Sequence, residues 1–309
     1  MNDTRWNNED FPYKCGFVTL IGRPNTGKST LLNALLGQKV AAVSPRPQTT
    51  QRRQLGILTL ENAQIIFMDT PGIHNPHHKL GEYMNEIAKA TLEQADVLIW
   101  MVDLSVSPHQ EDLLIADFLK EIEHLPPAIL ALNKVDLLSP NQTQNRQDSY
   151  HNLIPQADPV LLSATSGAGQ QQLLSEIIDR LPSSPPLYSA EQITDFYERE
   201  IAADLIREAA LLHLRDEIPH AIAVRIDEYK ERGESGNYIA ATLFVERESH
   251  KGIVIGQKGS MIKTIGSTAR QEIEAMSGQR TYLELRVKIK KNWRNNSSVL
   301  RYFGFVENK

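Results

Sequence analysis

Two glycines, a lysine and a serine near the amino terminus are spaced for phosphate chemistry. Gly22 and Gly27 let the backbone wrap closely, so that successive N–H groups point toward an anion. Lys28 neutralises phosphate charge, Ser29 offers a hydroxyl ligand to Mg²⁺, and a helix beginning at Lys28 adds the positive end of its dipole. For this motif alone, the alternative is a glycine-rich turn between a strand and a helix. The predicted phosphate-binding residues are Gly22, Arg23, Pro24, Asn25, Thr26, Gly27, Lys28, Ser29 and Thr30.

A second motif follows an apolar run and is expected to face the same phosphates. The Asp69 carboxylate is placed to reach the Mg²⁺ through water, and the Gly72 amide is placed to sense a γ-phosphate. By itself the segment is also compatible with an ordinary turn. The predicted residues here are Asp69, Thr70, Pro71 and Gly72.

Two later segments predict recognition of guanine. A carboxylate at Asp136 accepts both the ring N–H and the exocyclic amine of guanine, a donor pair that adenine lacks. A wrong base leaves buried polar groups unpaired, which gives strong discrimination. The alternative role of Asp136 is a helix N-cap. The predicted base-binding residues are Asn133, Lys134, Asp136, Ser163, Ala164 and Thr165, and the backbone N–H of Ala164 is expected to meet the guanine carbonyl.

These motifs are expected at the carboxyl ends of strands in one sheet. Short apolar runs alternate with amphipathic stretches from Gly16 to Leu181, which predicts a doubly wound, mostly parallel α/β sheet. The predicted strands are residues 16–22, 55–60, 64–69, 95–103, 128–133 and 159–163, and the predicted helices are residues 28–36, 77–94, 111–124 and 170–181. The proline-rich stretch 182–186 cannot continue a helix and marks a domain boundary.

The pattern after this boundary differs and predicts a smaller α+β fold. A helix at 194–213, strands at 221–231 and 238–248, a short helix ending near 255, a helix to about 276 and a strand at 282–290 give the order α-β-β-α-α-β. The Gly-x-x-Gly turn between the two later helices, residues 256–259, lets a sugar-phosphate backbone approach. The alternative is a glycine-capped connection between two helices.

Cations concentrate in this part of the chain. Their alternation with apolar residues in 286–291 predicts a strand with one basic face. The alternative is an edge strand whose lysines prevent pairing with another strand. The predicted RNA contacts are Ile255, Gly256, Gln257, Lys258, Gly259, Lys263, Lys288 and Lys290.

Bulk composition is compatible with two globular domains. The chain has 309 residues, of which 41% are hydrophobic and 23% are charged. Its net charge of −5 argues against a protein that is basic throughout, but it allows one basic patch. Cys15 is the single cysteine, so neither an intramolecular disulfide nor a cysteine-based zinc site is expected. The sequence shows no signal peptide and no apolar run long enough to cross a bilayer, which indicates a cytoplasmic protein.

Together with Gln48-Thr49-Thr50 after the first predicted helix, the four nucleotide motifs resemble those of translation-factor-related GTPases. From about Cys15 to its end the chain resembles the Era family, bacterial ribosome-assembly GTPases with a carboxyl-terminal type II KH domain. The resemblance implies GTP/GDP and Mg²⁺ as cofactors, and a switch threonine, either Thr49 or Thr50, that closes over the metal. It also implies a disordered tail at 1–14, a GTPase domain at 15–182, a linker at 183–190 and a KH domain at 191–309.

The resemblance further implies which residues serve catalysis: Asn25, Lys28, Thr49, Thr50 and Gly72. Ile73 occupies the position at which Ras-like GTPases place a water-orienting glutamine, so slow intrinsic hydrolysis is expected. In Era-like relatives an asparagine equivalent to Asn25 helps to hold a potassium ion, and potassium stimulation is expected here. The nearby histidines His74, His77 and His78 lack a matching carboxylate at ligand spacing, so a solvated switch segment is favoured over a metal site.

The resemblance implies a GTP-hydrolysing switch that binds the 3′ end of 16S ribosomal RNA and assists assembly and maturation of the 30S subunit. The alternative is an RNA-binding scaffold in which the guanine nucleotide is structural. A monomer is expected. The resemblance leaves peripheral association with the inner face of the membrane open, with the basic patch as the surface that would reach anionic lipid.

Overall fold

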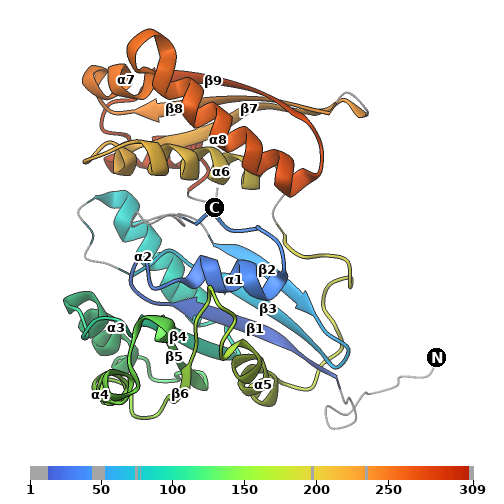
Figure 1. The fold of residues 1–309 in the computed structure, drawn as a ribbon, viewed down its shortest axis with the longest axis vertical. Helices are drawn as coiled ribbons and strands as arrows, with labels where there is room; N and C mark the ends of the chain where they lie inside the picture. The colour runs from blue at the N-terminus through green and yellow to red at the C-terminus, as the bar shows by residue number, and fades with distance from the viewer. Residues whose placement is uncertain are drawn as a thin grey trace. The chain divides into compact units, whose positions relative to one another are not determined.

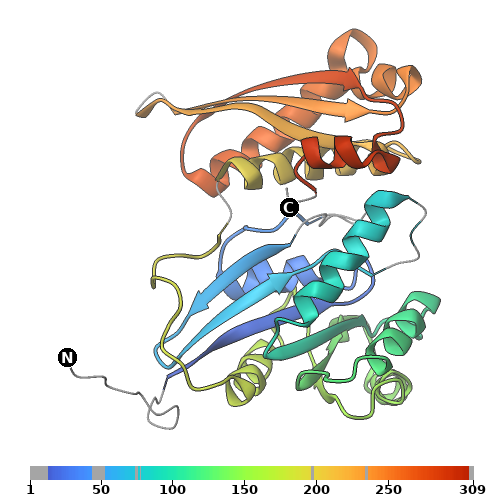
Figure 2. The same cartoon turned by 180° about the vertical axis from the view of Figure 1, so that it is seen from behind.

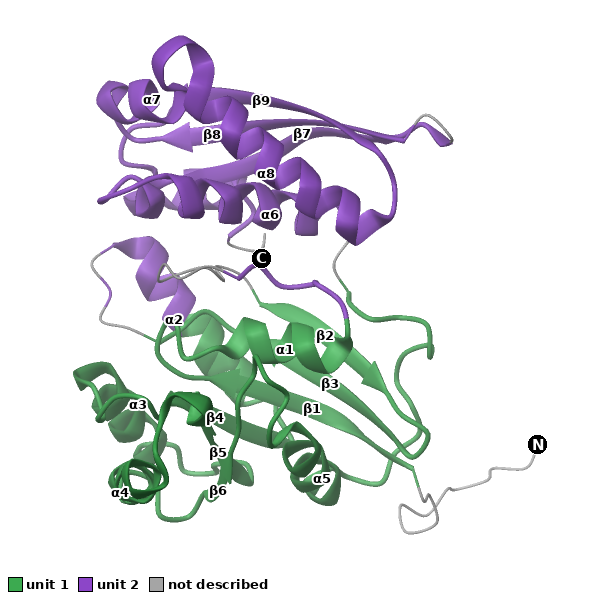
Figure 3. Cartoon of the chain, in the orientation of Figure 1, with its two compact units in different colours: residues 1–37, 53–74, 86–195 green, residues 38–52, 75–85, 196–309 purple. Residues whose placement is uncertain are grey.

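The computed structural model describes residues 13–43, 53–73, 76, 78–195, 198–233 and 236–305. Their contacts divide the chain into two compact units (Figure 3). The first unit contains the described residues of 1–37, 53–74 and 86–195, and the second contains those of 38–52, 75–85 and 196–309. No helix among the described residues combines the length and apolarity needed to cross a bilayer.

A six-stranded sheet forms the centre of the first unit (Figure 1). The strand order is β2-β3-β1-β4-β5-β6, and all neighbours are parallel except β2 and β3. Three central strands are buried at every position, as expected where helices cover both faces. The strands are β1 (Lys14–Ile21), β2 (Gln54–Thr59), β3 (Ala63–Asp69), β4 (Val97–Asp103), β5 (Ala128–Asn133) and β6 (Asp158–Leu161).

Four α-helices of the described chain and the second half of α2, from residue 86, belong to this unit. Helices α1 and α5 lie on one face of the sheet, and α3 and this half of α2 lie on the other (Figures 1 and 2). The helices are α1 (Lys28–Leu36), α2 (Lys79–Leu92), α3 (Gln110–Lys120), α4 (Pro140–His151) and α5 (Gln170–Arg180), and the 3₁₀ turn η1 (Val135–Leu137) precedes α4. The sequence analysis missed α4, which has no apolar periodicity and buries only Tyr150. The doubly wound, mostly parallel sheet is otherwise as predicted.

The second unit contains a three-stranded sheet in the order β7-β8-β9, in which β7 and β8 are antiparallel and β8 and β9 are parallel. The α-β-β-α-α-β order is as predicted, and a short helix, α9, follows it. The elements are α6 (Glu198–His213), η2 (Pro219–Ala221), β7 (Ala223–Glu231), β8 (Asn237–Val245), α7 (Glu248–Ile255), η4 (Gln257–Gly259), α8 (Ser260–Ser277), β9 (Thr281–Ile289), η5 (Trp293–Asn295) and α9 (Ser297–Tyr302).

Helices α6 and α8 cover one face of this small sheet. Alternate β8 residues, including Ile239 and Leu243, join Leu205 of α6 and Ile265 of α8 in one buried cluster. Trp293 lies in a separate aromatic cluster with Phe303 and Phe305, and its indole N–H donates to the carbonyl of Ala221 at 3.0 Å. The Trp293 side chain is therefore part of the core.

The stretch that follows α5 lies along the first unit. The buried side chain of Gln64 in β3 accepts backbone N–H bonds from Leu187 at 2.8 Å and Tyr188 at 2.9 Å. The backbone N–H of Ile57 in β2 donates to the carbonyl of Ile193 at 2.7 Å. These bonds attach residues 187–193 to β2 and β3 of the six-stranded sheet. The domain limits drawn from the sequence stay a prediction.

Candidate functional site

The first glycine-bearing loop connects β1 to α1 in a conformation that requires glycine. Gly22 has φ 153° and Gly27 has φ 103°, in the region that side chains disfavour. A Cβ atom on Gly22 would lie 2.2 Å from the carbonyl oxygen of Met101, and one on Gly27 would lie 2.3 Å from Nδ2 of Asn133. The loop therefore packs tightly over the ends of β4 and β5, and a side chain at either glycine would displace it.

Lys28 begins α1 and is almost fully buried. Its ammonium donates to the backbone carbonyls of Gly22 at 2.9 Å and Arg23 at 3.0 Å, and no described carboxylate forms an ion pair with it. Burial lowers the pKa of Lys28 to about 8 because the charged form loses its hydration. The buried ammonium of Lys28 is bonded only to carbonyls of its own loop in the described chain, and a phosphate anion would supply the negative charge that it lacks. The residues present therefore fit a nucleotide.

The predicted metal ligands also come together at the ends of neighbouring elements. The hydroxyl of Ser29 donates to a carboxylate oxygen of Asp69 at 3.1 Å, and Asp69 is fully buried at the end of β3. A hydroxyl beside a carboxylate is an oxygen donor set suited to Mg²⁺. Both candidate switch threonines, Thr49 and Thr50, lie outside the described residues.

The segment after Asp69 closely approaches the loop predicted to bind phosphate, residues 22–29, which is called the phosphate loop below. Thr70 donates its hydroxyl to the carbonyl of Leu20 at 2.8 Å, which ties the segment to β1. A Cβ atom on Gly72 would lie 3.0 Å from the backbone nitrogen of Pro24. Ile73 packs against an apolar cluster beside β4, so its side chain offers no polar group for orienting water.

Asn133 joins three of the predicted segments. Its amide Nδ2 donates to the carbonyl of Thr26 at 2.7 Å, and its Oδ1 accepts the backbone N–H of Ala164 at 2.9 Å. The phosphate loop, the end of β5 and the loop after β6 are thus held at one edge of the sheet. Asp136 lies in η1 beside them, and its side chain is exposed. In the last of these loops the hydroxyls of Ser163 and Thr165 are 3.2 Å apart.

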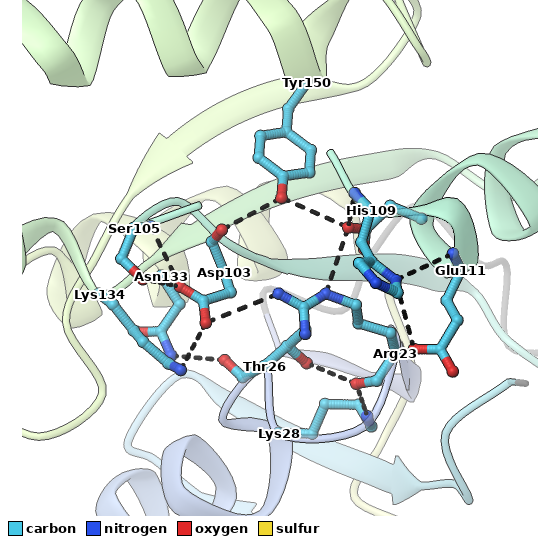
Figure 4. A network of polar contacts seen from close by, with 11 residues as sticks. Arg23, Thr26, Lys28, Asp103, Ser105, His109, Glu111, Asn133, Lys134 and Tyr150 are labelled. Carbon is cyan, nitrogen blue, oxygen red and sulfur yellow. Dashed lines mark hydrogen bonds and ion pairs between the residues drawn. The ribbon is translucent and has the colours of Figure 1, made fainter. Parts of the chain in front are cut away.

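Sequence reasoning missed a polar network behind this site (Figure 4). Lys134 contacts the carboxylate of Asp103 at 2.6 Å, and the guanidinium of Arg23 lies 3.7 Å from the same carboxylate. Burial acts to raise the pKa of Asp103, but hydrogen bonds from Lys134 and Ser105 outweigh it and lower the pKa. Asp103 is the last residue of β4, at the edge of the sheet where the four motifs meet. An aspartate at the carboxyl end of a predicted strand is the sequence signal that could have identified it as a site residue.

The Gly-x-x-Gly turn of the second unit separates α7 from α8. Gly256 and Gly259 have φ angles of 72° and 79°, and Lys258 between them has φ 51°. A Cβ atom on Gly256 would lie 2.7 Å from the backbone nitrogen of Met261, whereas one on Gly259 would meet nothing within 4 Å. There is therefore no room for a side chain at Gly256, whereas the space beside Gly259 is empty and another backbone can approach there.

The residues around this turn combine exposed cations with apolar groups. Val254 is buried, whereas the side chain of Ile253 is 50% exposed. In β9 the residues that face the helices are apolar, so the pleat places Arg286 and Lys288 on the opposite face. Arg286 pairs with Glu284. The predicted RNA-contacting lysines are exposed and form no ion pair with a described residue: Lys258, Lys263, Lys288 and Lys290.

Comparison with known proteins matches two separate parts of the chain to two families. Residues 17–134 match the family described as 50S ribosome-binding GTPase, and residues 217–294 match the KH domain family. The fold and the site thus define a P-loop GTPase followed by a KH domain. GTPase Era of Ruminiclostridium cellulolyticum is 44% identical over 297 residues, which cover 96% of this chain and 99% of that protein. GTPase Era of Heliobacterium modesticaldum is 44% identical over 294 residues, covering 95% and 98%.

Solved structures agree along nearly the full length. A crystal structure of Era in complex with MgGDPNP and nucleotides 1506–1542 of 16S ribosomal RNA matches with a TM-score of 0.90 and 40% identity, covering 96% of this chain and all of that one. A variant of Aquifex aeolicus Era bound to GDP.AlF4⁻ matches with a TM-score of 0.89 and 40% identity, covering 95% of this chain and all of that one. The chain belongs to the Era family of GTPases.

Proposed function

We propose that this chain hydrolyses GTP to control its binding to the 3′ end of 16S ribosomal RNA, and so assists assembly and maturation of the small ribosomal subunit. The observation that carries the proposal is that Asn133 joins the loops predicted to bind phosphate and guanine, in the same chain as a Gly-x-x-Gly turn that is open at Gly259 and carries the exposed Lys258. The relative solved with MgGDPNP and 16S ribosomal RNA nucleotides 1506–1542 supports this pairing of ligands.

In the nucleotide site each residue has a role that follows from its position. The loop N–H groups and Lys28 bind the phosphates, while Ser29 and Asp69, with Thr49 or Thr50, hold Mg²⁺, which supplies charge neutralisation when bound. Asp136 accepts from the guanine edge. Gly72 closely approaches Pro24 of the phosphate loop, so a small displacement of that loop also displaces the backbone at Gly72. This contact supports a role of Gly72 in sensing the γ-phosphate.

Potassium is the proposed additional cation, held with the help of Asn25. This residue has φ 65°, so Asn25→Gly removes the side chain without backbone strain. GTP turnover in potassium buffer is expected to exceed that in sodium buffer in the wild type, and to be equal in the two buffers in the variant. Equal wild-type rates would refute the potassium role.

In the second unit the Gly-x-x-Gly turn binds single-stranded RNA. Lys258 and Lys263 contact phosphates, the loop amides lie against the sugar-phosphate backbone, and the flanking apolar residues line a groove for unstacked bases. Cytoplasmic location is part of the proposal, and the exposed lysines are the surface proposed to reach anionic lipid at the inner membrane.

The experiment that tests the function measures affinity for an RNA oligonucleotide of the 16S 3′ end with GDP and with a non-hydrolysable GTP analogue. A nucleotide can shift the RNA-binding state only through differential affinity, so the two conditions must differ. An RNA of scrambled sequence is the control. Equal affinities would favour the alternative, an RNA-binding scaffold with a structural nucleotide.

A further inference from the structure

One buried carboxylate beside the nucleotide site belongs to none of its four motifs. Asp112 lies in the first turn of α3 and is completely buried. Its Oδ2 accepts the backbone N–H of His109 at 2.9 Å and Nε of Arg23 at 3.2 Å, and the hydroxyl of Tyr150 lies at 3.4 Å. Its Oδ1 has no hydrogen-bond partner among the described residues.

Capping α3 does not account for this burial. A capping carboxylate works at the surface, where it keeps its hydration, whereas burying a charge is costly unless a partner compensates. Asp112 is buried because Arg23, 89 residues away in the sequence, reaches it from the phosphate loop. Since a buried ion pair is weak evidence for a gain in stability, the geometry it fixes is the better explanation.

Arg23 connects this carboxylate to the phosphate-binding lysine. While its side chain points to Asp112, its backbone carbonyl accepts hydrogen bonds from Lys28 Nζ at 3.0 Å and from the Thr26 hydroxyl at 3.1 Å. Its guanidinium also lies 3.7 Å from Asp103. The first turn of the phosphate loop is therefore held from outside by carboxylates and carries the phosphate-binding cation on its inner side.

We propose that Asp112 is a positioning residue of the nucleotide site, which acts through Arg23 to fix the first turn of the phosphate loop and the ammonium of Lys28. The inference rests on the assignment of this loop to the phosphates. Asp112 touches no nucleotide atom in this scheme. Loss of the Asp112 carboxylate weakens the binding of the phosphates and leaves the recognition of the base unchanged.

The test is a double-mutant cycle read by the release rate of a fluorescent GDP. Asp112→Asn keeps an acceptor for the helix cap but removes the charge, and Arg23→Gln keeps the helix cap intact. Each single variant is expected to release GDP about tenfold faster, which corresponds to a loss of about 1.4 kcal/mol in binding, because the contact that holds the first turn of the loop is lost. The double variant is expected to release it about tenfold faster as well, because both changes break one interaction.

Two further readouts separate positioning from damage to the fold. The ratio of the affinities for GDP and inosine diphosphate, which lacks the exocyclic amine, is expected to stay at the wild-type value in Asp112→Asn, because this variant leaves the contact between Asp103 and Lys134 in place. Asp117→Asn is the matched control on the same helix, because its side chain is 73% exposed, and it should behave as the wild type. The thermal midpoint of the nucleotide-free variants reports any general loss of structure.

The outcomes are distinct. Additive effects in the double variant, or unchanged release from Asp112→Asn while wild-type GDP binding is tight, would overturn the positioning role and leave the GTPase assignment intact. A wild-type protein that fails to bind GDP would instead overturn the assignment of the loop. If Asp112→Asn unfolds, Arg23→Gln alone decides, because an unchanged release rate in that variant contradicts the inference.

Discussion

The base specificity that we propose for the site depends on one exposed carboxylate. Asp136 is held by η1 beside Asn133, whose own side chain is fully occupied by the phosphate loop and by Ala164. In Asp136→Asn the amide cannot accept two donors, and it offers a donor to a carbonyl instead. The affinity for GDP is expected to fall at least about 100-fold, and the affinity for xanthosine diphosphate to rise, since hydrogen bonds to charged groups contribute about 1.5–3 kcal/mol each.

Competition against a fluorescent nucleotide measures both affinities for this variant. Asp117→Asn, on the exposed side of α3, is the control and should retain the wild-type order of preference. A variant that binds GDP as the wild type does would show that another group recognises the base.

The buried ammonium of Lys28 makes GDP binding depend on pH. Burial lowers its pKa from 10.5 to about 8 in the nucleotide-free protein, so the neutral form is favoured there between these two values. The stability of the nucleotide-free fold therefore rises with pH across this window, because the unfolded chain binds the proton more strongly. Phosphates restore the charge, so GDP binding must take up a proton and weaken as pH rises above about 8.

Calorimetry in two buffers of different ionisation enthalpy measures that proton. At pH 8 the expected uptake by Lys28 is about half a proton per GDP bound. Lys28→Arg keeps its charge at every pH in this range and is expected to lose the uptake. The same uptake in wild type and variant would assign the proton to another group.

At the scale of elements, the buried glutamine of β3 anchors the stretch after α5. Gln64 accepts from two backbone N–H groups, and its Nε2 donates to the carbonyl of Tyr188 at 2.9 Å and to Thr59 at 3.0 Å. Gln64→Leu has a similar volume but leaves these groups unpaired, which costs roughly 1–3 kcal/mol for each buried group. Protease cleavage within 182–195 is expected to accelerate, and the thermal midpoint of the first unit to fall.

Timed proteolysis with identification of the cut sites checks this effect. Gln144→Leu is the control, because Gln144 lies on the exposed side of α4 and bonds only Asp148 among the described residues. Cleavage at the wild-type rate in Gln64→Leu would mean that the sheet-edge bonds of Ile57 and Leu55 hold the stretch without it.

The elements that position the site could be predicted because their signals are local. The glycines of the phosphate loop and the apolar runs of β1 to β5 are short patterns, and α1 begins and ends at the predicted residues. Helix α4 could not be found because a polar surface helix carries no apolar period, and α9 because it is a single short turn packed on distant aromatic residues. The contact between Arg23 and Asp112 joins residues 89 positions apart, a distance at which one sequence carries no signal.

At the scale of the whole molecule, the nucleotide and RNA sites lie in different compact units. The described nucleotide residues belong to the first unit, and the Gly-x-x-Gly turn belongs to the second, so each site can be disabled by itself. Lys258 is exposed within that turn, and no described carboxylate pairs with it. Lys258→Glu replaces the proposed phosphate contact by a repulsion. It is expected to weaken RNA binding at least about tenfold and to lower the salt dependence of binding by about one charge.

Fluorescence anisotropy of a labelled 16S 3′-end oligonucleotide over a series of salt concentrations measures both quantities. GDP affinity, measured in parallel, is expected to stay at the wild-type value because no atom of the nucleotide site changes. Lys120→Glu makes the same charge change on α3, outside the proposed RNA surface, and separates a local contact from the effect of net charge. If both variants lose RNA affinity equally, attraction of the RNA depends on the charge of the whole protein, and the Gly-x-x-Gly turn is not the contact that holds it.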